Sequence, residues 1–83
     1  MFVRPVEVIE RSLVDMSSLA SLGLSSRECE VAAQLSTGAT NRQIAETLGI
    51  TVGTVKKHLQ RIFATLDTET RTAAAAIVVR TLH

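Results

Sequence analysis

Hydrophobic residues recur along this chain at alternating steps of three and four positions, the spacing that places them on one face of an α-helix. After Pro5 the pattern runs from Val6 to Ala20 and predicts an N-terminal amphipathic helix. Residues 17–26, rich in serine around Gly23, overlap its end and predict a linker of turn-forming residues. The helical pattern then resumes in four segments: the first begins after a cap at Ser25 or Ser26 and ends by Gly38, and the others run over residues 41–48, 52–66 and 71–82.

No segment predicts a strand and the connections are short, so the sequence indicates an all-α fold. The 83 residues are enough for one domain, and the two Phe with no Trp or Tyr favour packed helices over a twisted sheet. In this interpretation residues 1–22 form a short N-terminal helix and linker. Residues 23–83 form a single four-helix domain.

The helix ends carry recognisable capping residues. Ser25 and Glu28 have the spacing of a capping box, in which each side chain bonds a free amide of the first turn. Either Thr40 or Asn41 can cap the helix at residues 41–48, and Gly49 can adopt the left-handed conformation that often ends a helix. These signals predict where the second and third helices begin and end.

A three-residue turn, Gly49–Thr51, joins the helix at 41–48 to the helix at 52–66, and its threonine can cap the second helix. Two helices joined by so short a turn containing glycine form a helix-turn-helix arrangement. The turn is too short for antiparallel packing. The second helix is therefore expected to cross the first steeply and to keep its outer face uncovered.

The helix at 52–66 has two contrasting sides. Its apolar side is expected to pack on the domain and comprises Val52, Val55, Leu59, Ile62, Phe63 and Leu66. Its far side carries Gly53, Lys57, Gln60, Arg61 and Ala64, flanked by Thr54 and His58, with Lys56 nearer the apolar margin. No acidic residue occurs from residue 51 to residue 65, so the cations have no partner on their own helix.

Such a surface has the chemistry that binds DNA. Lysine and arginine neutralise phosphates and release counterions, and together with glutamine they match acceptors and donors on base edges. The net charge of the chain is only +1, so this electrostatic argument is local to one helix. A basic patch by itself could equally be an ordinary solvated helix face. The short helix and three-residue turn before it favour DNA binding instead.

Four motifs occur in the order and spacing of one known family: "SRECEV", "TNRQIAETLGI", "TVKKHLQRIF" and "ETRTAAA". Residues 24–76, which contain them, strongly resemble the LuxR-type, or GerE-type, helix-turn-helix domain of bacterial transcription regulators. The resemblance implies a four-helix domain that binds double-stranded DNA sequence-specifically as a transcriptional regulator. The helix at 52–66 would be the recognition helix in the major groove.

The resemblance also implies individual DNA contacts. Lys56, Lys57 and Gln60 would face the bases, with Thr54, His58 and Arg61 flanking them towards phosphate and sugar. Thr40, Asn41 and Thr51 stand at or near helix starts, where amides and hydroxyls can meet phosphates. For Asn41 and Thr51 the alternative is a helix cap, and both roles can coexist. Val55 completes the set of expected DNA-binding residues.

The last helix is apolar almost all round and needs cover on two sides. Ala73, Ile77 and Val78 are expected to pack inward, which leaves a second face of Ala75, Val79 and Leu82. We expect that face to pair with a second copy in a homodimer, as the resemblance also implies, on an inverted repeat with half-sites about one helical turn apart. The alternative cover is the N-terminal helix.

Two other functions stay open from the sequence alone. A sigma-factor region-four module resembles "IAETLGITVGTVK" and reads promoter DNA within RNA polymerase, which is also a candidate partner of a LuxR-type regulator. A helical module that binds a protein and never touches DNA is the second alternative. The affinity of such a module for its protein partner would not depend on Lys56 or Lys57.

Other chemistry is not expected. The acids form no paired cluster and no glycine loop has phosphate-binding spacing, so we predict that the chain is not an enzyme. A single Cys29 cannot form an internal disulfide or, alone, a zinc site, so no metal or cofactor is predicted. The apolar run at residues 73–79 is too short to cross a bilayer, which takes about 20 residues, and the start lacks a signal peptide. We expect a cytoplasmic protein with no membrane contact.

Regulators of this type generally carry a receiver or ligand-binding domain before the DNA-binding one. Only some twenty residues precede it here, so the chain is either a stand-alone regulator or a part of a longer one, such as the effector domain of a response regulator. No small-molecule ligand is evident from the sequence.

Overall fold

The structure, a computed structural model, describes residues 17–82. Its helices are α2 (Ser26–Ser36), α3 (Asn41–Leu48), α4 (Val52–Thr65) and α5 (Arg71–Leu82), preceded by a helical turn at residues 17–20. The described range contains no strand, which confirms the all-α prediction. The helices begin and end within about one residue of the positions that the periodicity and the capping signals predict.

The capping residues explain these boundaries. Ser25 Oγ accepts a hydrogen bond from the amide of Glu28 (3.2 Å), and Glu28 Oε1 accepts one from the amide of Ser25 (3.1 Å). Thr40, and not Asn41, caps α3. Gly49 ends α3 with a φ of 68°, in the left-handed region that glycine adopts at little cost. The capping box at Ser25 is therefore confirmed.

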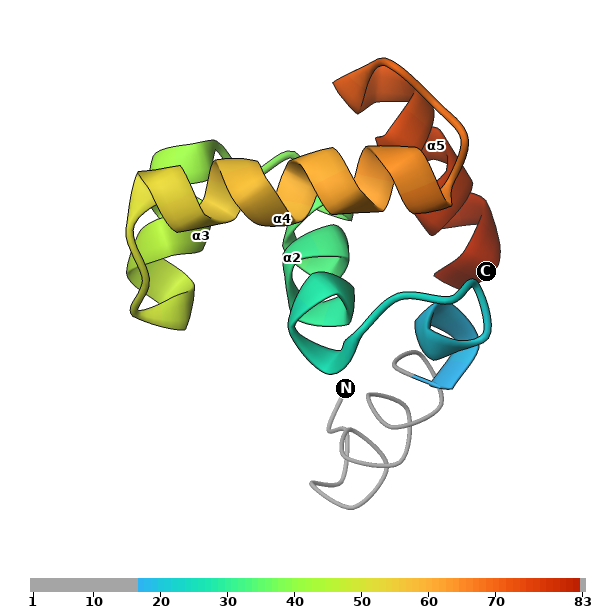
Figure 1. The fold of residues 1–83 in the computed structure, drawn as a ribbon, viewed down its shortest axis with the longest axis horizontal. Coiled ribbons are helices and arrows are strands. Elements are labelled where there is room, and N and C mark those ends of the chain that lie inside the picture. Colours follow the sequence, from blue (N-terminus) through green and yellow to red (C-terminus); the bar gives the residue numbers. More distant parts are fainter. Residues whose placement is uncertain (1–16, 83) are drawn as a thin grey trace, which may run out of the picture.

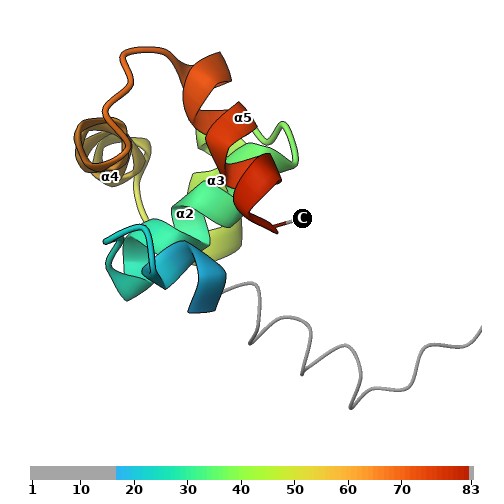
Figure 2. The ribbon, with the colours of Figure 1, turned by 90° about the vertical axis from the view of Figure 1, so that its right-hand side faces the viewer.

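Helix α4 crosses α2 and α3, while α5 packs mainly on α2 (Figure 1). Seen along α4 in Figure 2, α5 lies to one side, and it meets α4 less extensively than it meets α2. Both α2 and α4 pack against the other three helices, so the described domain is built around these two crossing helices.

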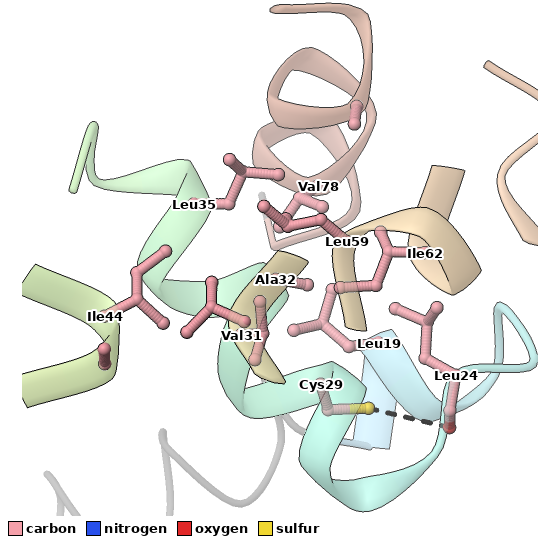
Figure 3. Packing of buried hydrophobic residues seen from close by; sticks show 13 residues of the cluster. Leu19, Leu24, Cys29, Val31, Ala32, Leu35, Ile44, Leu59, Ile62 and Val78 are labelled. Carbon is pink, nitrogen blue, oxygen red and sulfur yellow. Dashed lines mark hydrogen bonds between the residues drawn. The ribbon is translucent and has the colours of Figure 1, made fainter. Parts of the chain in front are cut away.

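The core forms where α2 meets its neighbours (Figure 3). It consists of Leu19, Leu24, Cys29, Val31, Ala32, Leu35, Ile44, Ala45, Val55, Leu59, Ile62, Ala74 and Val78. Cys29 serves here as a small buried hydrophobe, with its thiol 3.8 Å from the carbonyl oxygen of Leu24. Burial, reinforced by the carboxylates of Glu28 and Glu30, raises the pKa of the Cys29 thiol, so it stays protonated at neutral pH.

The segment before α2 belongs to this core. The predicted N-terminal helix falls mostly on residues 1–16, outside the described range, but residues 17–20 are helical and not a linker. Leu19 is fully buried. The turn that follows brings Gly23, at a φ of 94°, so close to α4 that an added Cβ would lie 3.5 Å from Thr65 Cγ2. Residues 17–20 are thus helical, as the helix predicted through Ala20 requires, and the turn at residues 21–23 lies within the predicted linker, which begins later than residue 17.

Two predicted apolar faces also differ from the structure. Val52, at the start of α4, is 37% exposed and does not join the core. On α5 the fully buried residues are Ala74 and Val78, whereas Ala73 and Ile77 are half-buried. A helix that is apolar all round has no polar side to fix its rotation, so its sequence did not identify which face packs inward.

Replacing Leu19 tests whether the segment before α2 is part of the folded unit. We expect Leu19→Ala to lower the free energy of unfolding by about 2–5 kcal/mol, because it leaves a cavity in the core. Leu22→Ala is the matched control, since Leu22 is only half-buried and its loss should cost less. Urea denaturation measures both. A Leu19→Ala variant as stable as the unsubstituted chain would show that the helical turn at residues 17–20 does not stabilise the fold through Leu19.

Candidate nucleic-acid interface

Helix α4 buries one side and exposes the other. Val55, Leu59 and Ile62 lie in the core and fix the rotation of the helix. The exposed residues of α4 are Val52, Gly53, Lys56, Lys57, Gln60, Arg61, Ala64 and Thr65, and Thr54 and His58 are half-buried. Every cation that the sequence placed on the outer face is therefore available to an external partner. Lys56 is exposed as well, although the sequence placed it nearer the apolar margin.

Val55 is the exception among the predicted DNA-binding residues. Its side chain is fully buried between α4 and the rest of the core. A residue at this position cannot reach a base or a phosphate without unfolding the helix from the domain. We therefore remove Val55 from the candidate interface, since the same 100° spacing that exposes Lys57 turns Val55 inward.

The exposed cations of α4 lack acidic partners. Within residues 17–82, two pairs of oppositely charged side chains lie within 4.0 Å of each other: Arg27 with Glu30 at 2.9 Å, on α2, and Arg42 with Glu46 at 3.4 Å, on α3. Lys57 and the other cations of α4 take part in neither. Like charges at helical spacing repel one another, so this arrangement costs α4 a few tenths of a kcal/mol per pair.

The start of α4 is held by Thr51. Its Oγ1 accepts a hydrogen bond from the amide of Thr54 at 3.1 Å and lies 2.9 Å from the hydroxyl oxygen of Thr54. Thr51 is thus the helix cap that the sequence allowed. The same residue is exposed beside the first free amides of the helix, where the positive end of the helix dipole favours an anion. Capping and phosphate contact are compatible at this position.

The start of α3 is organised differently. Thr40 Oγ1 accepts from the amide of Gln43 at 3.1 Å, so Asn41 is the first residue of the helix and not its cap. Asn41 Oδ1 instead accepts a hydrogen bond from Arg71 Nη1 at 2.6 Å. Arg71 Nη2 donates to the carbonyl oxygen of Ala39, also at 2.6 Å. The exposed Thr40 and the half-buried Asn41 therefore lie on the surface beside a bound guanidinium.

Sequence reasoning missed Arg71 as a residue of this surface. The sequence identified Arg71 only as the first residue of the last helix, in the motif "ETRTAAA", and indicated no contact for its side chain. Together with α4 it lines a shallow hollow of about 310 Å³, whose walls are Asn41, Lys56, Leu59, Gln60, Phe63 and Arg71. The hollow has two cations and no acid in its lining, so it extends the positive surface of α4 towards the starts of α3 and α5.

Other kinds of site find no support in the described residues. Between residues 17 and 82, no three His, Cys, Asp or Glu side chains gather in a way that could hold a metal ion. None of the helices in the same range is long and apolar enough to cross a membrane.

Comparison with known proteins identifies the family of this chain. The family model described as "Bacterial regulatory proteins, luxR family" matches residues 22–78, which include α2, α3, α4 and most of α5. This chain belongs to the LuxR family. The matched range also begins before α2, in agreement with the packing of the preceding turn on the core.

Curated relatives of this LuxR-family chain are regulators. It is 49% identical over 59 residues to the transcriptional regulatory protein LnrK of Bacillus subtilis (strain 168), a match that covers 71% of this chain and 27% of LnrK. It is 39% identical over 64 residues to the transcriptional regulatory protein LiaR of the same organism, covering 77% of this chain and 30% of LiaR. The chain thus spans less than a third of the length of these relatives. No solved structure is a significant match.

The cap of α4 can be tested by its effect on stability. We expect Thr51→Ala to lower the free energy of unfolding by about 1 kcal/mol, because the amide of Thr54 loses its acceptor. Thr47→Ala is the control, since Thr47 is an exposed threonine inside α3 and should change stability by less than about 0.5 kcal/mol. Thermal denaturation followed by circular dichroism measures both. Equal effects of the two substitutions would contradict the capping role.

Proposed function

We propose that this chain is the sequence-specific DNA-binding part of a bacterial transcriptional regulator, with α4 in the major groove of double-stranded DNA. The unpaired cations on the exposed side of α4 are the main support. Their mutual repulsion destabilises the isolated helix, and a phosphate backbone removes that cost while releasing counterions. Membership of the LuxR family agrees with this function.

The proposed contacts follow the exposed residues. Lys56, Lys57 and Gln60 are placed to reach base edges, where a good pair discriminates against a wrong base by about 1–3 kcal/mol. Thr54, His58 and Arg61 flank them on the sides that would face sugar and phosphate. The free amides at the starts of α3 and α4, with Thr40, Asn41 and Thr51, are placed to meet phosphates on either side of the groove. Backbone contacts of this kind fix the register from which α4 reads the bases.

We also propose that the chain binds an inverted repeat as a homodimer through α5. The predicted interface of Ala75, Val79 and Leu82 needs revision, because Ala75 and Leu82 are half-buried against the core of their own chain. Val79 is 38% exposed, and Ala76 is exposed on the same side of α5. Small and apolar side chains there would let two α5 helices approach closely about a two-fold axis.

A regulator of this type would act on the chromosome in the cytoplasm, with RNA polymerase as a further partner. The alternative of a sigma-factor region-four module is less favoured, because the LuxR-family match extends into α5, to residue 78. A helical module that binds only protein is the remaining alternative, and the DNA-binding experiment below separates it from the proposal.

Selection of bound sequences from random duplexes, at two salt concentrations, tests the DNA interface. We expect a defined sequence preference and an affinity that falls steeply with salt. Lys57→Ala should lose about 1–3 kcal/mol of binding free energy and relax the preference at one base position. Arg27→Ala is the charge-matched control, because Arg27 lies on α2 and is paired with Glu30. Absence of duplex binding in dilute buffer, or equal losses in both variants, would contradict the proposal.

Sedimentation of the chain with and without an inverted-repeat duplex tests the dimer. We expect Val79→Lys to weaken self-association, because it places a charge at the centre of the proposed interface. Val52→Lys is the control of matched exposure, since Val52 is 37% exposed on α4 and Val79 is 38% exposed on α5. The homodimer would be ruled out if the unsubstituted chain stayed monomeric both in solution and on the duplex.

A further inference from the structure

Arg71 connects two helices whose backbones do not meet. No Cα atom of α3 lies within 8 Å of a Cα atom of α5. The guanidinium of Arg71, at the start of α5, nevertheless donates to Asn41 Oδ1 and to the carbonyl oxygen of Ala39, both at 2.6 Å. The two acceptors stand 30 and 32 positions earlier in the chain, whereas the helix caps and ion pairs of the domain join close neighbours.

The geometry of the side chain suits this connection. A guanidinium is planar and presents separate N–H groups in a fixed fork, so one arginine can hold two oxygen atoms in a set orientation. Ala39 and Asn41 lie on either side of Thr40, the cap of α3. Arg71 thus holds the backbone of Ala39 on one side of the cap of α3 and the side chain of Asn41 on the other.

We infer that Arg71 is a positioning residue: it holds the start of α3 in the orientation that presents Thr40 and the free amides of α3 to a DNA phosphate. The inference rests on the proposed function, because the orientation of α3 matters to a phosphate only if the chain binds DNA. It also means that α5, the helix proposed to pair two protomers, is joined through Arg71 to a surface that contacts DNA. The pairing of two protomers through α5 and the contact of α3 with a phosphate would then both depend on the bonds of Arg71.

Direct phosphate binding by Arg71 is the competing role, since Lys56 lies across the same hollow. The two roles differ in their response to salt. A cation that neutralises a phosphate contributes about one unit to the slope of log affinity against log salt concentration, and a residue that acts through neutral amides contributes little. The salt slope of an Arg71 variant therefore distinguishes positioning from contact.

The test compares Arg71→Gln with Arg80→Gln in the full chain, using the duplex selected by the unsubstituted protein. Both variants lose one positive charge from α5, but Arg80 is exposed, whereas Arg71 is half-buried and donates to Asn41 and Ala39. We expect Arg71→Gln to bind roughly fivefold more weakly with an unchanged salt slope, a loss equivalent to about 1 kcal/mol. Arg80→Gln should bind as the unsubstituted chain does.

Hydrogen exchange gives a second readout that needs no DNA. The amide of Ile44 donates to the carbonyl oxygen of Thr40 at 2.9 Å, in the first turn of α3. Its exchange should accelerate severalfold in Arg71→Gln and stay unchanged in Arg80→Gln. Arg71→Lys, which keeps the charge but not the planar fork, should accelerate exchange as well and serves if Arg71→Gln does not fold.

The outcomes separate this inference from the proposed function. A salt slope lower by about one in Arg71→Gln, or affinity and exchange equal to those of Arg80→Gln, would overturn the positioning role while leaving DNA binding intact. If the unsubstituted chain binds no duplex, the proposed function fails and the inference fails with it. Faster exchange of Ile44 together with weaker binding at an unchanged slope would support the inference.

Discussion

Burial of Val55, Leu59 and Ile62 against the core fixes which side of α4 faces solvent, and the rest of the interface depends on it. Fully burying one such side chain stabilises a domain by about 1.5–3 kcal/mol. Repulsion between neighbouring cations on a helix costs only a few tenths of a kcal/mol per pair. Packing therefore outweighs the repulsion, so the unbound domain stays folded although Lys56, Lys57 and Arg61 have no acidic partners.

The helix ends carry the second part of the arrangement. Thr40 and Thr51 each satisfy one amide of the first turn with a side-chain oxygen, and each stands at the surface beside amides that have no acceptor within the helix. The same local rules that set the helix boundaries thus also leave free amides, which attract anions, at the exposed starts of α3 and α4.

Sequence reasoning succeeded where structure is decided by neighbours in the chain. Helix caps act over three positions, and the sides of α4 follow from a strong contrast between apolar and cationic residues, so both were predictable. The rotation of α5, the burial of Leu19 and the bonds of Arg71 depend on distant parts of the fold. Val55 shows most clearly where a motif misleads. The family motif assigned it to the DNA interface, whereas the helical spacing of α4 turns its side chain into the core.

The most direct test of the account is a nuclear magnetic resonance measurement of contacts between this domain and the duplex that it selects. The account predicts intermolecular proton contacts from Lys57 and Gln60 to base protons of the major groove, with shifted amide signals at the starts of α3 and α4. Contacts made instead by the surface of α2, or α4 signals unchanged at saturating duplex, would contradict it.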